Sequence, residues 1–292
     1  MKTYSHSTAP IFEEHLAAIE EMSLIPSGID RLLFSMSRKS FFFLCWGKLT
    51  RKRQAIYLHE PTSVKDVFYA DISVRAKFRG YAQLLVAQLC LLLVNLIIVD
   101  NQKCLTRCRS NYFLPKSVKV RVARLPFSDH IHLQSMGSED FFLGVLGRID
   151  KFRSLQEYSA ASHSLVVCTS SQVEVSDKVL IHHAGCPFSI DIKNEFFKLV
   201  SCLLCVSFFK NAQSGVVAEA LWRGVPCFVS HFEPYSRYLP SYFVVNNFSE
   251  LSTKLSDRRE LEIQVTEFKS HFDLDAYREE VKNEWRRIEV GR

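Results

Sequence analysis

The sequence has few glycines and prolines, the residues that interrupt helices and strands. Its 292 residues include only 10 glycines and 9 prolines, which excludes collagen-like and low-complexity proteins. Hydrophobic residues make up 47% and charged residues 23%, which excludes intrinsic disorder. A chain of this length buries about three quarters of its unfolded surface, so it needs no disulfide or structural metal. At roughly 150 residues per domain, we expect two domains.

Neither sign of charge dominates. Lysine and arginine total 37 against 31 aspartates and glutamates, which gives a net charge of +6. This excess favours phosphate-bearing ligands or an anionic membrane face and is too small to indicate a nucleic-acid partner. Residues 51–53 form a basic cluster with Lys48, which fits either a solvated loop or contact with anionic lipid headgroups.

The nine cysteines form no disulfide framework, because their number is odd and most lie in apolar runs. Cys202 and Cys205 have CxxC spacing, but no second pair follows at zinc spacing. We expect two buried thiols, with a metal or redox centre as the alternative. Free thiols fit a reducing cytoplasm, and we expect no signal peptide in the first residues.

No hydrophobic run is long enough to span a membrane. The longest, at residues 84–99, falls short of the roughly 20 residues that a spanning helix needs, and Gln88 and Asn95 interrupt it. This run predicts a buried helix that leads into a strand at residues 96–100. We therefore expect a soluble protein, or one that lies on a membrane surface.

Strand-like apolar runs alternate with helical patterns, which indicates α/β layers with parallel sheets. Besides the helix and strand predicted within residues 84–100, the first half predicts a helix at residues 11–22 and strands at residues 2–5, 41–45, 55–58 and 118–122. Residues 41–43 are expected in the core. After a linker at residues 126–140, the second half predicts a Rossmann-like unit. Its strands are at residues 141–147, 164–168, 178–182, 202–208 and 226–230, and its helices at residues 151–161, 192–201 and 214–223. We expect an N-terminal domain at residues 1–130, a C-terminal domain at 138–272 and an amphipathic helix at 273–292.

Residues 213–230 (QSGVVAEALWRGVPCFVS) carry the sharpest motif. They predict a helix that begins near Ser214 and ends at Gly224, followed by a strand. Ser214 can cap this helix, and free N–H groups at Gly215 and the next residue can hold an anion. Glu219, one turn into the helix, either projects towards that anion or is a solvated helix residue.

This segment resembles the carboxyl-half signature of GT-B glycosyltransferases, in particular the large retaining, nucleotide-sugar-dependent group called family 4-like. Residues 146–153 (LGRIDKFR) resemble the turn that opens the second domain of that family, and residues 57–61 (YLHEP) resemble a loop of its acceptor-side domain. The three matches occur in the family's order. The resemblance implies an α/β protein of two Rossmann-like, doubly wound domains that face each other across a cleft.

The resemblance also implies roles for residues of the motif. Glu219 matches the acid that hydrogen-bonds the nucleotide ribose, and Ser214 and Gly215 match positions whose N–H groups approach the diphosphate. Asn211 stands where the family has an acid that contacts the donor sugar, so the chain departs from the pattern there. An amide can hydrogen-bond a hydroxyl group but carries no charge.

Three cations follow the predicted strand at residues 141–147, where a doubly wound sheet binds its ligands. The Arg148 guanidinium can clamp a diphosphate with two hydrogen bonds, and Lys151 or Arg153 can add a second charge. We expect Arg148 and Lys151 to stabilise the departing nucleoside diphosphate, without a metal or other cofactor. The alternative is a set of surface charges at a helix start, where the dipole disfavours cations.

Two loop histidines are further candidates. His59 follows a predicted strand and can hydrogen-bond the donor sugar or the acceptor, since a histidine titrates near neutral pH; a structural histidine is the alternative. His6 lies on the first loop and would face the same cleft, although that loop lacks the glycine pair usual in the family.

The sequence therefore predicts a cytoplasmic glycosyltransferase, free or peripheral to the inner face of the membrane. It would move a sugar from a nucleotide-sugar donor to a glycan or lipid-linked glycan acceptor, with retention and without a metal. Two alternatives stay open. A nucleotide-sugar epimerase on this scaffold would need acids and bases that the sequence does not reveal. A degenerate, non-catalytic binding subunit is favoured by Asn211 and by the short first domain.

Overall fold

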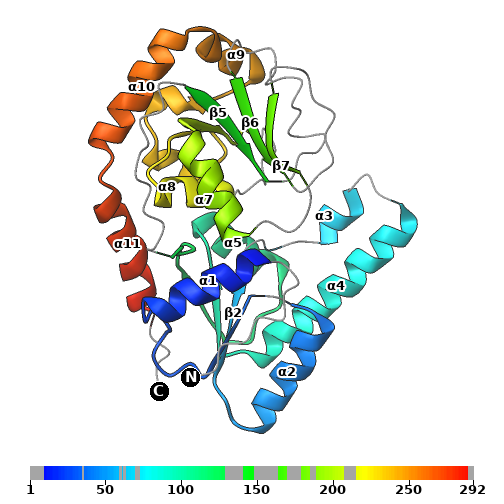
Figure 1. Cartoon of the computed structure of the whole chain (residues 1–292). Helices are drawn as coiled ribbons and strands as arrows, with labels where there is room; N and C mark the ends of the chain where they lie inside the picture. The colour runs from blue at the N-terminus through cyan, green and yellow to red at the C-terminus, as the bar shows by residue number, and fades with distance from the viewer. Residues whose placement is uncertain are drawn as a thin grey trace. The chain divides into compact units, whose positions relative to one another are not determined.

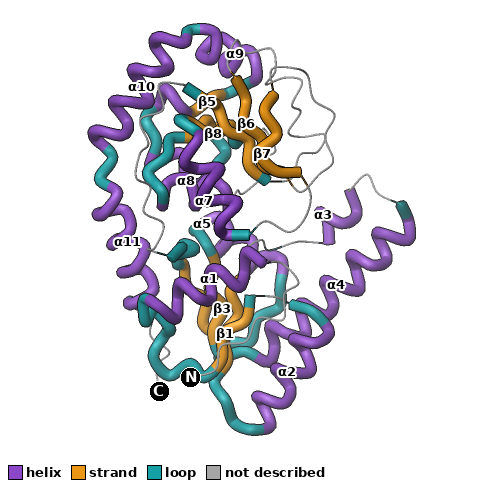
Figure 2. Tube along the Cα trace, viewed as in Figure 1, coloured by secondary structure: helices purple, strands orange, loops and turns teal. Residues whose placement is uncertain are grey.

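The computed structural model describes most of the chain: residues 10–34, 36–58, 61, 64–69, 73–128, 141–147, 164–169, 179–184, 189–206 and 215–288. The chain divides into two α/β units, which Figures 1 and 2 show as separate sheets with their own helices. The first unit comprises residues 1–128 and 279–292, and the second comprises residues 129–278. Helix α11 (Leu274–Arg286) carries the chain from the second unit back to the first.

The first unit is built on a four-stranded parallel sheet in the order β1-β2-β3-β4. Its strands are β1 (Arg31–Leu33), β2 (Gln54–Leu58), β3 (Leu96–Val99) and β4 (Lys119–Val122). Its helices are α1 (Pro10–Glu21), α2 (Arg38–Leu49), α3 (Val64–Tyr69), α4 (Val74–Leu93) and α5 (Gln102–Asn111). Strands β2 and β3 are buried along their whole length, as expected for the centre of a parallel sheet.

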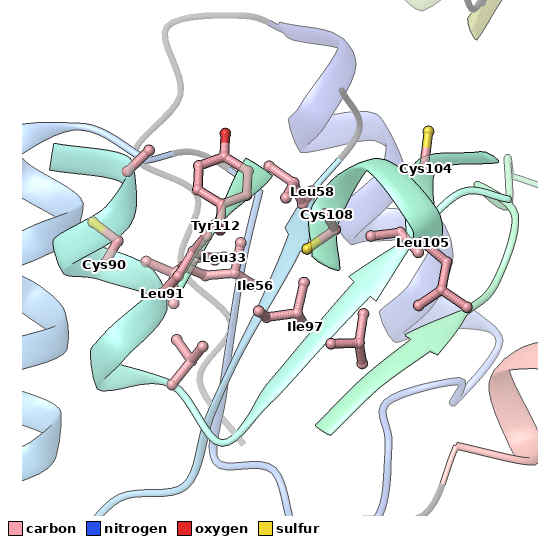
Figure 3. Packing of buried hydrophobic residues seen from close by; sticks show 14 of the residues in the cluster. Leu33, Ile56, Leu58, Cys90, Leu91, Ile97, Cys104, Leu105, Cys108 and Tyr112 are labelled. Carbon is pink, nitrogen blue, oxygen red and sulfur yellow. The ribbon is translucent and has the colours of Figure 1, made fainter. Parts of the chain in front are cut away.

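A hydrophobic core fills the space between this sheet and its helices. Figure 3 shows Leu91 of α4 and Cys108 of α5 in one cluster with Ile56 of β2 and Ile97 of β3. Leu44 of α2 belongs to the same core. Helices α2, α4 and α5 therefore share one packed layer against one face of the sheet.

Helix α11 is held in the first unit by its C-terminal half. Trp285 is fully buried, its ring stacks on Tyr57, and its Nε1 donates a 2.7 Å hydrogen bond to the Arg124 carbonyl oxygen. The Arg124 guanidinium lies 2.8 Å from Glu284 and 2.9 Å from Glu280. The predicted amphipathic helix thus buries its tryptophan and pairs its acids with a buried arginine.

The second unit has a six-stranded parallel sheet in the order β10-β9-β8-β5-β6-β7. Its strands are β5 (Phe142–Leu146), β6 (Ser164–Thr169), β7 (Val179–Ala184), β8 (Cys202–Leu204), β9 (Cys227–Ser230) and β10 (Val244–Val245). Its helices are α7 (Ile190–Leu199), α8 (Gly215–Trp222), α9 (Phe248–Ser256) and α10 (Arg258–His271), with short 3₁₀ helices at Pro234–Tyr238 and Ser241–Phe243. The strand order reverses between β5 and β8, which is the dinucleotide-binding arrangement.

Two glycines, one within β5 and one directly after it, explain how the chain forms this reversal of strand order. A Cβ on Gly144 would lie 2.6 Å from Val200 and 2.8 Å from Leu203, so only glycine lets the end of α7 and strand β8 pack so closely. Gly147 follows β5 with a φ of +101°, a conformation that L side chains rarely adopt. The chain therefore turns sharply where β5 ends, beside the point at which ligands bind in sheets of this order.

Most of the predicted strands and helices in the described residues are confirmed, but the strand expected at residues 41–45 is wrong. These residues lie in α2, whose first turn is capped by Ser37, because the Ser37 hydroxyl accepts a 3.1 Å hydrogen bond from the Ser40 N–H. Phe42 was expected in the core and is instead 70% exposed. The strand expected at residues 2–5 and the helix expected at 151–161 lie outside the described residues.

The described cysteines are free thiols, and all but Cys45 are buried. The expectation for Cys202 and Cys205 is confirmed, since both lie in the core. Burial raises the pKa of Cys90 and of Cys168 to about 12, so both are neutral thiols at physiological pH. Within the described ranges, no group of three or more His, Cys, Asp or Glu side chains could hold a metal ion.

Candidate functional site

Helix α7 brings a lysine into the interior of the second unit. Ser189 caps the helix by accepting a 3.2 Å hydrogen bond from the Ile192 N–H. Phe196 and Phe197 pack inward, and Gly144 leaves room for this side of the helix against the sheet. Lys193, at the end of the first turn, is only 6% exposed. A lysine so deeply buried needs a negative partner.

Helix α8 supplies that partner. It is buried from Val217 to Trp222, and Glu219, in its middle, is only 2% exposed. The helix ends as the sequence predicts, because Gly224 takes a φ of +68° and the Val225 N–H donates to the Ala220 carbonyl oxygen at 2.9 Å. This ending fixes Glu219 in the core of the unit.

Glu219 is the centre of a buried ion cluster, which we define as Lys193, Glu219, Arg223 and Asn194. Lys193 Nζ lies 3.1 Å and Arg223 Nη2 lies 2.8 Å from Glu219 Oε1. Arg223 Nη1 donates a 2.9 Å hydrogen bond to Asn194 Oδ1, and the guanidinium lies over the ring of Phe197 at 4.3 Å. Helices α7 and α8 are thereby joined through charges that are shielded from water.

The electrostatics of this cluster favour an ionised carboxylate. Burial by itself would raise the pKa of Glu219, but the positive charges of Lys193 and Arg223 and their hydrogen bonds lower it below its ordinary value. Nearby Cys168 on β6 has its pKa raised, chiefly by burial and further by the negative charge of Glu219. Of the four residues of the ion cluster, two carry a positive charge and one a negative charge.

The arrangement is suited to holding an anionic ligand close to the sheet. Both ion pairs use Oε1 of Glu219, so Oε2 lies outside them. The same helix begins at Gly215, one turn before Glu219, and helix N-termini attract anions. Gly147 marks the end of β5 at the reversal of strand order. A carboxylate, two cations and a helix start therefore belong to the part of the unit where such sheets bind nucleotides.

Of the residues that sequence reasoning selected, the structure describes Glu219 and Gly215. The others lie outside the described residues: His6, His59, Arg148, Lys151, Arg153, Asn211 and Ser214. The interpretation of Glu219 as a solvated helix residue is wrong, because Glu219 is buried in two ion pairs. The reason is that α8 carries apolar residues on every side and so lies inside the unit.

Lys193 and Arg223 were missed, although each left a signal in the sequence. Arg223 stands four residues after Glu219, which is the favourable order for an ion pair on a helix. Lys193 stands near the start of a helix, where the dipole disfavours a cation, so a lysine there indicates a specific partner. No sequence pattern indicates that this partner is Glu219, 26 residues later.

The first unit contains a cavity of about 530 Å³ between the start of α2 and the middle of α4. Arg38 and Arg79 contribute charge to its lining, and Val67, Leu84 and Tyr112 contribute apolar surface. Such a lining fits a molecule that carries both an anionic and an apolar part.

Comparison with solved structures identifies several proteins of similar fold. HepE from Anabaena, in complex with UDP-glucose, matches with a TM-score of 0.59 and 10% identity over 86% of this chain and 77% of its own. Sucrose-phosphate synthase from Thermosynechococcus elongatus matches with a TM-score of 0.57 and 13% identity, over 88% and 69%. The trehalose-phosphate synthase from Burkholderia xenovorans, in complex with glucose-6-phosphate, gives 0.53 and 9%, over 94% and 77%.

The chain has the GT-B fold. The fold class expected from the sequence is confirmed, and the resemblance to GT-B glycosyltransferases is confirmed at the level of the fold. No protein-family model and no curated protein sequence matches this chain. Among the described helices, none combines the length and apolar character that crossing a membrane requires.

Proposed function

We propose that this protein transfers a sugar from a nucleoside-diphosphate sugar to a hydroxyl group of a glycan or lipid-linked glycan. The observation that carries the proposal is the second unit, whose GT-B architecture has its reversal of strand order between β5 and β8. HepE shares the fold and was solved with UDP-glucose, with UDP and glucose, and with UDP. A donor of the same chemical class is therefore the natural ligand to propose here.

The proposed donor site uses the elements that follow β5 and β8. Arg148 comes directly after Gly147 in the chain, and Gly215 begins α8. Arg148 and Lys151 would contact the diphosphate, with Arg153 and Ser214 as further contacts. Oε2 of Glu219, which its ion pairs leave available, would accept hydrogen bonds from ribose hydroxyl groups.

Catalysis in this proposal is electrostatic. The bond from the sugar to the diphosphate breaks while the acceptor oxygen bonds to the same carbon. Negative charge grows on the leaving diphosphate, which takes up the proton of the acceptor hydroxyl group. Arg148 and Lys151 would stabilise that charge, and no metal or other cofactor would be required. His59 and His6 would position the donor sugar or the acceptor. We propose retention of the anomeric configuration, as the resemblance to the retaining family implies.

The acceptor would bind to the first unit. Its cavity of about 530 Å³ combines guanidinium groups from Arg38 and Arg79 with apolar walls. A lipid-linked glycan, which carries phosphate and hydrocarbon together, has both features. We propose a cytoplasmic location, where nucleotide sugars and free thiols coexist.

Two other functions on this scaffold differ from transfer in what they produce. Asn211 replaces the acid that contacts the donor sugar in the family, which would suit a binding subunit without turnover. An epimerase would change the sugar of the donor without any acceptor. Incubating the protein with labelled nucleotide sugars and a panel of acceptors separates these functions.

Transfer predicts label in the acceptor together with release of nucleoside diphosphate in equal amounts. Epimerisation predicts a new nucleotide sugar, and a binding subunit predicts saturable binding without any product; either result would overturn the proposal. Arg148→Ala should abolish most of the transfer. Arg258→Ala, at an exposed ion pair with Glu262 on α10, is the matched control and should retain activity.

A further inference from the structure

Helix α2 has an apolar stripe on its outer side. Phe42, Trp46 and Leu49 are 70%, 62% and 79% exposed. Their spacing of four and then three residues places them on one face of the helix. Leu44 and Gly47, on the opposite side, are buried. Folding therefore leaves an apolar stripe of this helix in water.

Helix α4 repeats the pattern over a greater length. Val74 and Phe78 are each 71% exposed, and Leu85 is 62% exposed. Leu89 and Leu92 continue the same line at 37% each. The spacing from Val74 is four, 11, 15 and 18 residues, which keeps all five within one narrow face of a helix with 3.6 residues per turn.

The two stripes point out of the same side of the first unit. Leu44 of α2 and Ala87, Cys90 and Leu91 of α4 belong to one core cluster on the sheet. Helices α2 and α4 also contact each other and lie side by side in Figures 1 and 2. Since each stripe is opposite its own buried face, the two stripes form one surface, which we call the α2–α4 face.

The surroundings of this face are strongly basic. Residues 38–53 contain six lysines and arginines and no acidic residue, and residues 74–93 contain three and none. These nine positive charges exceed the net charge of +6 of the whole chain. Lys39, Lys48 and Arg51 are exposed beside the α2 stripe, while Lys52 lies 3.9 Å from Asp30. The apolar stripes are thus flanked by cations along α2 and at the start of α4.

We propose that the α2–α4 face lies on an anionic phospholipid bilayer. Phenylalanine, tryptophan and leucine would enter the boundary between headgroups and acyl chains, and the surrounding lysines and arginines would bind phosphate groups. This pairing of exposed apolar side chains with exposed lysines and arginines is the chemistry of a peripheral membrane helix. The proposal is independent of the sugar-transfer activity proposed above.

The charge also decides against a second copy of the chain as the occupant. A two-fold contact through the α2–α4 face would bring the same cations against each other, with no acidic residue in either helix to neutralise them. Nucleic acid offers phosphate groups and bases that can stack on Phe42 or Trp46, but most of the face is aliphatic and has no ring on which a base can stack. A bilayer satisfies both the apolar and the basic part of the face.

Flotation with vesicles tests the proposal directly. The full chain should float with vesicles of phosphatidylcholine mixed with phosphatidylglycerol, should stay behind with phosphatidylcholine alone, and should be released by salt. The triple variant Phe42→Ser/Trp46→Ser/Leu49→Ser changes exposed side chains only and should lower the partition coefficient at least about tenfold, since buried apolar area sets insertion. Ile263→Ser, at an exposed apolar residue of α10, is the matched control.

A second variant tests the charges alone. Lys39→Glu/Lys48→Glu/Arg51→Glu should also lower binding at least about tenfold, because each cation near an anionic surface contributes to binding. The control variant Arg259→Glu, on α10, should not lower binding to the vesicles. Far-ultraviolet circular dichroism of every variant should match that of the original chain, because the substituted side chains are exposed.

Fluorescence gives an independent readout. The chain has three tryptophans, of which Trp222 and Trp285 are fully buried and Trp46 is 62% exposed. Anionic vesicles should therefore shift the emission of Trp46 to the blue, and brominated lipids should quench it. Absence of vesicle binding, equal binding to neutral vesicles, or a dimer that the triple variant dissociates would each overturn the proposal.

Discussion

Lys193 Nζ lies 3.1 Å from Glu219 Oε1, and both side chains are almost completely buried. The contact joins α7 to α8 in the unit for which we propose nucleotide-sugar binding. Arg223 approaches the same oxygen at 2.8 Å, so one buried carboxylate pairs with two buried cations. The buried ion cluster therefore links the two helices, and Oε2 of its carboxylate lies outside both ion pairs.

Removing the charge of Glu219 should destabilise the protein. Glu219→Gln removes the negative charge that pairs with Lys193 and Arg223, and breaking a buried ion pair in this way costs about 3–5 kcal/mol. Urea unfolding measures the loss. Glu195→Gln, at an exposed ion pair of α7 with Lys198, is the control and should change the free energy of unfolding by less than about 1 kcal/mol.

Removing Lys193 should cost less than removing Glu219. Lys193→Met preserves much of the side-chain volume and leaves Glu219 paired with Arg223, so we expect a loss of about 1–3 kcal/mol. The double variant Lys193→Met/Glu219→Gln should be more stable than the sum of the two losses predicts. Strict additivity in urea unfolding would show that the two side chains do not interact.

The stability of the protein should depend on Glu219 at low pH. Because Lys193 and Arg223 hold the pKa of Glu219 below its ordinary value, the carboxylate contributes stability above the unfolded pKa of about 4.3. That contribution is lost as the pH falls through the lower pKa of the folded state. Between pH 7 and pH 5, the free energy of unfolding of the original chain should therefore exceed that of Glu219→Gln by a constant amount. Below pH 5, this difference should shrink. A constant difference down to pH 2 would contradict the assignment.

Chelators should leave sugar transfer largely intact. In the proposed mechanism, Arg148 and Lys151 neutralise the diphosphate, so no metal ion is required. Measuring transfer with and without EDTA tests this expectation. If EDTA abolished transfer and manganese or magnesium restored it, a metal ion and not Arg148 and Lys151 would neutralise the diphosphate.

The sequence predicts the features of this site that depend on neighbouring residues in the chain. It does not predict those that depend on how distant segments pack. The helix at residues 215–222 is predictable because Gly224 supplies a local stop signal that the structure uses. The pairing of Lys193 with Glu219 is not predictable from the sequence, because it depends on how α7 and α8 pack on the sheet. The run at residues 41–43 misleads because three consecutive aromatic residues fit a buried strand as well as a helix, and only the cap at Ser37 and the exposure of Phe42 distinguish them.

Calorimetric titration with nucleoside diphosphates tests the central claim, that the second unit binds a nucleotide-sugar donor. One of UDP, GDP, ADP or dTDP should bind with a stoichiometry of one. Arg148→Ala should weaken that binding at least about tenfold, since a hydrogen bond to a charged group contributes about 1.5–3 kcal/mol. The control Arg258→Ala should bind normally. Absence of saturable binding of all four, or unchanged affinity in Arg148→Ala, would contradict the account.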